Sequence, residues 1–153
     1  VYNYHAVDND TVYIPATNRG SNFFTDGMSG HKVAPPHTIE QGLRNGTIFA
    51  LDLATGNVKW KFEIKFPPRV SPIVTDSILF CGYIPFTDKA KSGVILALDK
   101  ESGRKLWEYN TNAPIGPVGP SIGNGMLFVP TGKVQGMSNE VKHGGSIIAF
   151  GLP

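Results

Sequence analysis

The sequence of 153 residues contains one cysteine, Cys81, and no run of charge of a single sign. One cysteine excludes an internal disulfide and a metal centre built from several thiolates. Lys and Arg number 14 against 12 Asp and Glu, a net charge of +2. Because the basic residues are scattered, we expect no nucleic-acid partner. No apolar run approaches the about 18 residues that a membrane-spanning helix needs.

Short motifs of common enzymes are also missing. The sequence has no His-Glu-x-x-His, Gly-x-Ser-x-Gly, Cys-x-x-Cys or phosphate-binding glycine loop. Of its four histidines, His31 and His37 share a Pro-rich segment without an acidic partner at a recognised zinc spacing. The N-terminal residues lack the charged and apolar regions of a signal peptide, although the chain could be cut from a precursor. We expect surface histidines and, at Cys81, a buried and inert thiol.

Glycine and proline are abundant, with 18 and 12 residues. Proline recurs at the edges of apolar runs, where it is unfavourable for long helices and typical of short strands joined by turns. The composition therefore predicts an all-β protein.

A repeat organises these strands. "GTIFALDLATGNVKW" at residues 46–60 returns as "GVILALDKESGRKLW" at residues 93–107, with each matching position 47 residues apart. A weaker third copy, "GGSIIAFGLP", begins at Gly144. A period in the forties in an all-β chain indicates the four-stranded blades of a β-propeller.

The repeat predicts the following division of the chain, all within one propeller domain that covers 1–153. Blade 1 covers about 1–64 and holds an insertion at 19–45, blade 2 covers about 65–111, and an incomplete blade 3 covers about 112–153. Three antiparallel blades do not close a ring, because known propellers use about four or more. An open array also leaves unpaired sheet edges. We therefore expect a fragment, or one partner of a larger assembly.

The repeated turn has a physical interpretation. In "ALDLATG" and "ALDKESG" the Asp side chain can accept hydrogen bonds from turn amides, and the Gly supplies a positive φ. Trp60 and Trp107 follow on the next strand, where an indole can fill the gap between neighbouring blades. We expect inter-blade packing, rather than ligand stacking, for both rings.

These "A-L-D-x-x-[TS]-G-x-x-x-W" segments resemble the tryptophan-docking motifs of the pyrroloquinoline quinone (PQQ) repeat family. The order of "HAVDNDTVYIPATN", "SPIVTDSILFCG", "APIGPVGPSIGNGMLFVPTG" and "GGSIIAFGLP" is similar to the C-terminal portion of PQQ-dependent (quinoprotein) alcohol dehydrogenases. The resemblance covers nearly the whole chain and implies part of an eight-bladed propeller.

The resemblance implies a function. Such enzymes oxidise alcohols or aldose sugars in the periplasm or outside the cell and pass electrons to a cytochrome or a quinone. PQQ lies beside Ca²⁺ or a lanthanide, which polarises the quinone, and an Asp is the general base. The family's metal ligands and base lie upstream of the matched region. We therefore expect no catalytic and no metal-binding residue here, and no cofactor bound to this chain alone.

Two residues are candidates for cofactor binding. Asn18 in "YIPATN" matches the family's PQQ-contacting Asn, with one extra residue in the spacing; a turn-forming Asn is the alternative. Arg69 lies with Pro68 in "PPRVSPIVT", where the family has the aromatic floor beneath PQQ. "TGKVQGM" from Thr131 also lacks a family Trp. These losses leave a second hypothesis open, a non-catalytic PQQ-repeat propeller that serves as a scaffold or protein-binding platform.

Overall fold

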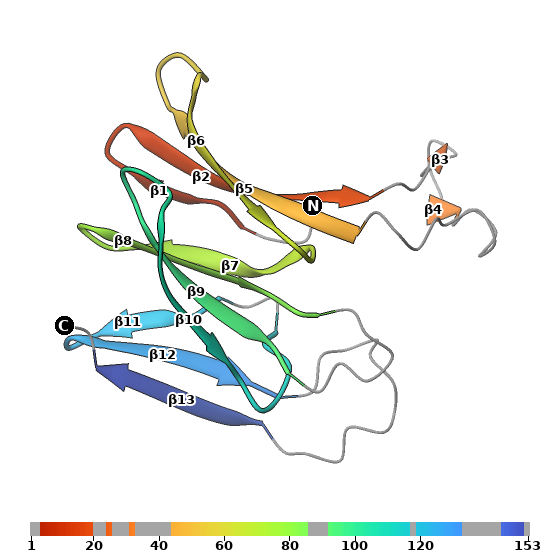
Figure 1. Cartoon of the computed structure of the whole chain (residues 1–153), viewed down its shortest axis with the longest axis vertical. Coiled ribbons are helices and arrows are strands. Elements are labelled where there is room, and N and C mark those ends of the chain that lie inside the picture. The colour runs from red at the N-terminus through yellow and green to blue at the C-terminus, as the bar shows by residue number, and fades with distance from the viewer. Residues whose placement is uncertain are drawn as a thin grey trace.

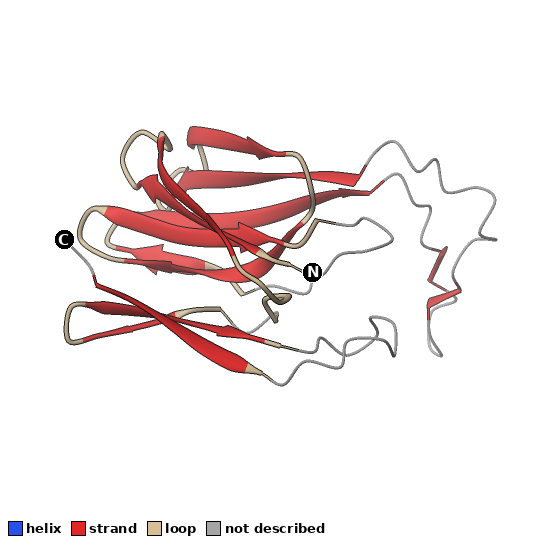
Figure 2. Ribbon diagram, turned by 60° about the horizontal axis from the view of Figure 1, so that its bottom comes forward, coloured by secondary structure: helices blue, strands red, loops and turns tan. Residues whose placement is uncertain are grey.

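The computed structural model describes residues 4–19, 24–25, 31–32, 44–85, 92–116, 119–132 and 145–151. Every regular element among them is a β-strand, and the strands form three layered antiparallel sheets and one short hairpin (Figure 1). A second view shows the same layers (Figure 2). The predicted all-β partial propeller is therefore confirmed. The described residues contain no helix that is long and apolar enough to cross a membrane.

The first sheet contains four strands in the order β1-β2-β5-β6. Its strands are β1 (Ala6–Asp8), β2 (Thr11–Arg19), β5 (Arg44–Asp52) and β6 (Val58–Ile64). The connection from β2 to β5 carries a hairpin, β3 (Phe24–Thr25) and β4 (His31–Lys32), that is drawn apart from the three sheets in Figure 1.

The second sheet repeats this arrangement in the order β10-β9-β8-β7. Its strands are β7 (Pro68–Val74), β8 (Ile78–Tyr83), β9 (Val94–Asp99) and β10 (Lys105–Asn110). β9 is buried along almost its whole length. Because both faces of this sheet are covered, β9 reads "VILALD" without polar alternation.

The third sheet has three strands in the described part of the chain, in the order β11-β12-β13. They are β11 (Ser121–Gly123), β12 (Met126–Thr131) and β13 (Ser146–Gly151). Asn124 and Gly125 join β11 to β12 with φ of 49° and 68°. Two positive φ values are typical of the tight turn of a twisted hairpin.

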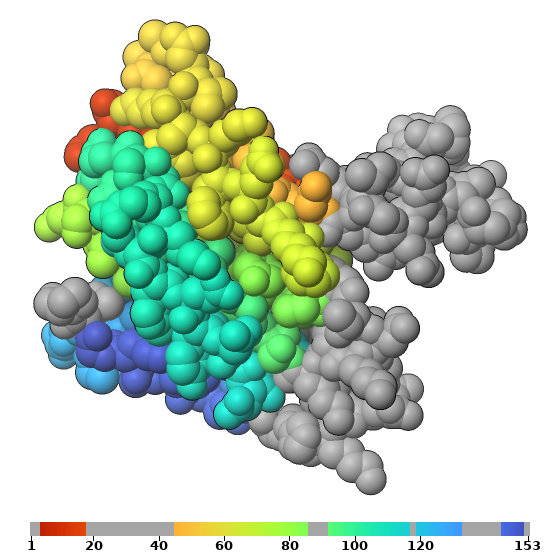
Figure 3. All heavy atoms as spheres, viewed as in Figure 1, coloured from red at the N-terminus to blue at the C-terminus, as the bar shows by residue number. Residues whose placement is uncertain are grey.

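Two hydrophobic clusters join the sheets face to face. The first lies between the first and second sheets and includes Tyr13, Ile48 and Leu96. The second lies between the second and third sheets and includes Val70, Ile95 and Leu127. Space-filling spheres show the coloured side chains of neighbouring sheets in contact (Figure 3). The core is therefore made of interfaces between sheets, as blade stacking requires.

Cys81 lies in the first of these clusters and is completely buried. Burial raises the pKa of its thiol to about 12, because a thiolate is unfavourable in apolar surroundings. The predicted buried thiol is confirmed, and its neutral form is the unreactive one at ordinary pH.

Two isoleucines at corresponding positions of the repeat should respond to the same substitution with effects of different size. Ile95 is 0% exposed in the second cluster, whereas Ile147 on β13 is 71% exposed. Ile95→Ala should lower the free energy of unfolding by about 2–5 kcal/mol, because it leaves a cavity. Ile147→Ala should change it by less than about 0.5 kcal/mol. Urea denaturation of both variants measures the difference, and equal losses would contradict the assigned interface.

Candidate functional site

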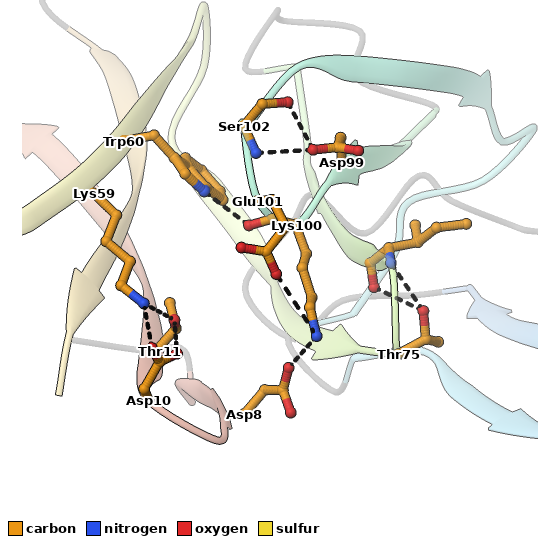
Figure 4. Close-up of polar contacts among 11 residues, drawn as sticks. Asp8, Asp10, Thr11, Lys59, Trp60, Thr75, Asp99, Lys100, Glu101 and Ser102 are labelled. Carbon is orange, nitrogen blue, oxygen red and sulfur yellow. Dashed lines mark hydrogen bonds and ion pairs between the residues drawn. The ribbon is translucent and has the colours of Figure 1, made fainter.

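The turn between β9 and β10, residues Asp99–Gly103, is held by side-chain and backbone hydrogen bonds. Asp99 Oδ1 accepts hydrogen bonds from Ser102 N at 2.8 Å and from Ser102 Oγ at 2.7 Å (Figure 4). The amide of Gly103 donates to the Asp99 carbonyl at 2.8 Å, and Gly103 has a φ of 70°. The Asp-Gly turn predicted from the sequence is confirmed.

Trp60 connects the first sheet to this turn. Its Nε1 donates to the Lys100 carbonyl at 2.8 Å, as Figure 4 shows. A Cβ added at Gly103 would lie 2.5 Å from Trp60 Cε3, so that the indole rests directly on the glycine. The ring also packs against Tyr13, with centroids 5.9 Å apart. Trp60 is 9% exposed, and the predicted inter-blade packing is confirmed for it.

A β-bulge lies directly before each tryptophan. The register between β5 and β6 shifts just before Trp60, which lies opposite Ala50, and the register between β9 and β10 shifts just before Trp107, opposite Ala97. A bulge increases local twist and redirects the side chain that follows. A small Ala across the strand leaves space for the indole.

Trp107 has different surroundings from Trp60. It packs edge to face on Phe150 of the third sheet, with centroids 5.1 Å apart, and stacks on Tyr109 at 5.8 Å. Gly151 stands where the other repeats have the turn Asp. Trp107 therefore packs between sheets, as predicted, through aromatic contacts.

Charged side chains strengthen the contact between the first and second sheets. Lys100, with 11% of its side chain exposed, pairs with Asp8 from β1, and this contact raises the pKa of Lys100. Within the first sheet, Lys59 Nζ lies 2.9 Å from an Asp10 oxygen and lowers the pKa of that carboxyl. Figure 4 shows both pairs beside the docked indole.

The segments that lead into β1 and β11 meet at Ser71 of β7. The amide of Tyr4, just before β1, donates to Ser71 Oγ at 3.3 Å. A Cβ added at Gly119, just before β11, would lie 2.3 Å from the Ser71 carbonyl oxygen. Segments of all three blades therefore meet at this buried serine.

The two predicted cofactor-binding residues are brought to one end of neighbouring sheets. Asn18 lies opposite Asn45 in the sheet, and the adjacent cross-strand pair is Thr17 with Gly46. A Cβ added at Gly46 would lie 2.1 Å from Cδ of Pro68, and Pro68 directly precedes Arg69. Asn18 is a strand residue of β2, so the turn-forming alternative is wrong. Arg69 is half-buried on β7.

Phe66 and Tyr83 form an aromatic pair at the same end, which the sequence did not predict. Phe66 stacks on Tyr83 with centroids 5.8 Å apart and planes 27° apart, and Lys65 Nζ lies 5.8 Å from the Phe66 centroid. Burial raises the pKa of the Tyr83 hydroxyl. Phe66 precedes the Pro-Pro pair of "FPPRV" directly, whereas no local signal links it to Tyr83.

The described residues contain no group of three His, Cys, Asp or Glu side chains that could hold a metal ion. His5 is exposed, and His31 has its backbone paired with Thr25 in the small hairpin. His37 and His143 lie outside the described residues.

The region 44–145, about two-thirds of the chain, matches the PQQ-repeat family model PQQ_2, described as "Outer membrane protein assembly factor BamB". No curated protein matches the sequence significantly.

Three solved dehydrogenase structures are similar to this chain in fold. The quinohemoprotein alcohol dehydrogenase ADHIIG from Pseudomonas putida HK5 is 19% identical, with a TM-score of 0.55 over 83% of this chain and 21% of that chain. A europium-containing methanol dehydrogenase is 20% identical, with a TM-score of 0.54 over 80% and 22%. The quinohemoprotein alcohol dehydrogenase from Comamonas testosteroni is 19% identical, with a TM-score of 0.51 over 80% and 20%. The chain spans about a fifth of each.

Trp60→Phe should lower the free energy of unfolding by about 1–3 kcal/mol, because the Lys100 carbonyl loses its donor at a largely buried contact. Trp107→Phe is the matched control, since Trp107 Nε1 donates to no described residue, and should cost less. Urea denaturation compares the two. A larger loss for Trp107→Phe would contradict the different roles assigned to the rings.

Stability should fall in acid through the two repeated Asp-Gly turns, Asp52–Gly56 and Asp99–Gly103, which we call the docking turns. Hydrogen bonds from Thr55 and Ser102 lower the pKa of Asp52 and Asp99. The pKa of each carboxyl is lower in the folded chain than in the unfolded chain, where it is about 3.9, so the two carboxylates stabilise the fold above that pH. This contribution is lost as the pH falls through the pKa of the folded chain. Urea midpoints should therefore drop between about pH 5 and 3. Asp52→Asn with Asp99→Asn should flatten that slope, and an unchanged slope would refute the assignment.

Proposed function

The chain belongs to the PQQ-repeat family, and from this premise we propose that it supplies blades to a PQQ-dependent dehydrogenase. The complete protein would oxidise alcohols or aldose sugars and pass electrons to a cytochrome or a quinone. This chain would contribute propeller wall and cofactor contacts, while the catalytic base and the Ca²⁺ or lanthanide ligands would come from other blades. A periplasmic or other extracytoplasmic location belongs to the same proposal.

One observation carries the proposal. The segments around Asn18 on β2 and Arg69 on β7, matched to the family by sequence order, lie at the same end of two neighbouring sheets. Gly46 contacts Pro68, and Gly46 is adjacent to Asn45, the cross-strand partner of Asn18. The structural similarity to dehydrogenase propellers over at least 80% of the chain supports the fold in which this arrangement occurs.

The residues present suit one side of such a cofactor. PQQ is a planar quinone that carries carboxylates, and when bound it would accept the electrons removed from the alcohol. The Arg69 guanidinium would bind a carboxylate by charge-assisted hydrogen bonds. By the family resemblance, Asn18 would supply a further hydrogen bond to the cofactor. Phe66 and Tyr83 offer aromatic surface near Pro68, in a segment where the family pattern has its floor.

A scaffold propeller is the second candidate. The matching family model carries the description of an outer-membrane assembly factor, and Pro68 and Arg69 replace the family's aromatic floor. The upstream sequence separates the two functions. Glu, Asn and Asp at the family's metal and base positions would support the dehydrogenase, whereas hydrophobic residues there would support the scaffold.

Reconstitution of the complete protein with PQQ and Ca²⁺ tests the dehydrogenase. We expect quinone absorbance and dye-linked oxidation of an alcohol or sugar. Arg69→Ala should weaken PQQ binding about tenfold or more, the effect of losing a charged hydrogen bond of about 1.5–3 kcal/mol. Arg104→Ala, directly after the turn Asp99–Gly103, is the matched control and should leave binding unchanged. The proposal would be rejected if the reconstituted protein showed neither quinone absorbance nor oxidation of an alcohol or sugar.

A further inference from the structure

The dipeptide Asn-Gly occurs twice in the sequence, as Asn45 with Gly46 and as Asn124 with Gly125. An asparagine before a glycine is prone to spontaneous loss of its side-chain amide, because the glycine has no side chain to hinder attack by its backbone nitrogen. That attack closes a five-membered ring and requires the peptide between the two residues to rotate. The surrounding backbone therefore decides which of the two pairs reacts in the folded chain.

Asn124 and Gly125 form the two-residue turn between β11 and β12. Gly123 pairs with Met126 across the base of this turn, so both turn residues lie outside the ladder. Both are exposed, and within the described residues neither the Gly125 amide nor the Asn124 side chain has a hydrogen-bond partner. A Cβ added at Gly125 would meet no described atom within 4 Å. The turn therefore leaves both the nucleophile and the space that the ring needs.

Opening this turn also disturbs little of the fold. β11, Ser121–Gly123, has only three residues and is the edge strand of the third sheet. Two of its three residues are exposed. Because a short and exposed edge strand has few contacts to lose, its end opens at a low cost in free energy.

The second pair lies inside a sheet. β5 runs between β2 and β6, and Gly46 pairs with Thr17 on one side and with Ile64 on the other. Gly46 is buried, and a Cβ there would lie 2.1 Å from Pro68 Cδ. Asn45 itself is exposed, so access to water does not distinguish the two asparagines. Rotation of the peptide before Gly46 would disrupt pairing with both neighbouring strands, and this protects Asn45.

We propose that Asn124 is a site of spontaneous deamidation in the folded protein. The Gly125 nitrogen attacks Cγ of Asn124 and forms the new C–N bond. The bond from Cγ to Nδ2 breaks, and Nδ2 leaves as ammonia with the proton from the Gly125 nitrogen. Water then opens the succinimide ring at either carbonyl and gives aspartate or isoaspartate. The net reaction consumes one water and releases one ammonia, and no group is oxidised or reduced.

The product changes the third sheet. The strands β11, β12 and β13 contain no charged residue, so the new carboxylate is the first charge on this hairpin. Isoaspartate also inserts a methylene into the main chain of a turn that has φ values of 49° and 68°. Ile122, which packs against the second hydrophobic cluster, lies two residues before Asn124. Deamidation should therefore loosen β11 from β12 and weaken the contact with the second sheet. This inference is independent of the dehydrogenase and scaffold functions.

Timed incubation of the full chain at mildly alkaline pH tests the site. Trypsin separates the two pairs, which fall in peptides 45–59 and 106–133, and mass spectrometry detects conversion of amide to acid in each. In guanidinium chloride both asparagines should react at similar rates. In native buffer Asn124 should stay within about tenfold of its unfolded rate, whereas Asn45 should slow by about a hundredfold or more. Equal rates at the two sites in native buffer, or a slower rate at Asn124, would overturn the proposal.

Asn124→Gly is the matched variant, because glycine accepts the positive φ of this turn position and carries no amide. Conversion should disappear from peptide 106–133, while the rate at Asn45 stays unchanged. Persistent conversion of that peptide would assign the reaction to another residue and overturn the proposal.

Urea denaturation of the incubated proteins measures the structural effect. The urea midpoint of the unsubstituted chain should fall as peptide 106–133 converts, whereas the midpoint of Asn124→Gly should not change with time. An unchanged midpoint in fully converted protein would refute the loosening of the third sheet.

Discussion

The hydrogen bond from Trp60 to the Lys100 carbonyl, with the indole lying on Gly103, is the contact on which the stacking of the first two blades depends. A sheet face is only a non-directional apolar surface, and many sliding positions would bury similar area. An indole donor and a glycine that admits a close approach restrict that freedom to one position. The Lys100–Asp8 pair acts at the same junction.

The contact also explains why the turn is repeated so closely in the sequence. The Asp side chain satisfies the turn's own amide and hydroxyl, so that the carbonyl of the next residue is available to a neighbour. The bulge before each Trp and the Ala opposite it supply the matching geometry. At this junction the first sheet therefore carries the donor, Trp60, and the second sheet carries the acceptor, the Lys100 carbonyl. Where Gly151 replaces the Asp, aromatic packing on Phe150 takes over.

The docking turns and the candidate cofactor-binding residues lie at opposite ends of the sheets. The docking turns lie at one end of the sheets, between β5 and β6 and between β9 and β10, whereas Asn18 and the start of β7 lie at the other end. Changes in the residues near Pro68 can therefore leave the docking turns and the stacking of the blades intact.

The sequence by itself determined the strands, the Asp-Gly turns and the inter-blade role of both tryptophans, because each depends on local chemistry repeated every 47 residues. It did not predict that Phe66 stacks on Tyr83, or that Asn18 is a strand residue paired with Asn45. Only the tertiary structure decided which docking turn is occupied. Asp52–Gly56 and Asp99–Gly103 share the pattern Asp-x-x-[Thr/Ser]-Gly and the same turn geometry, and they differ in whether another sheet of the described chain lies against them.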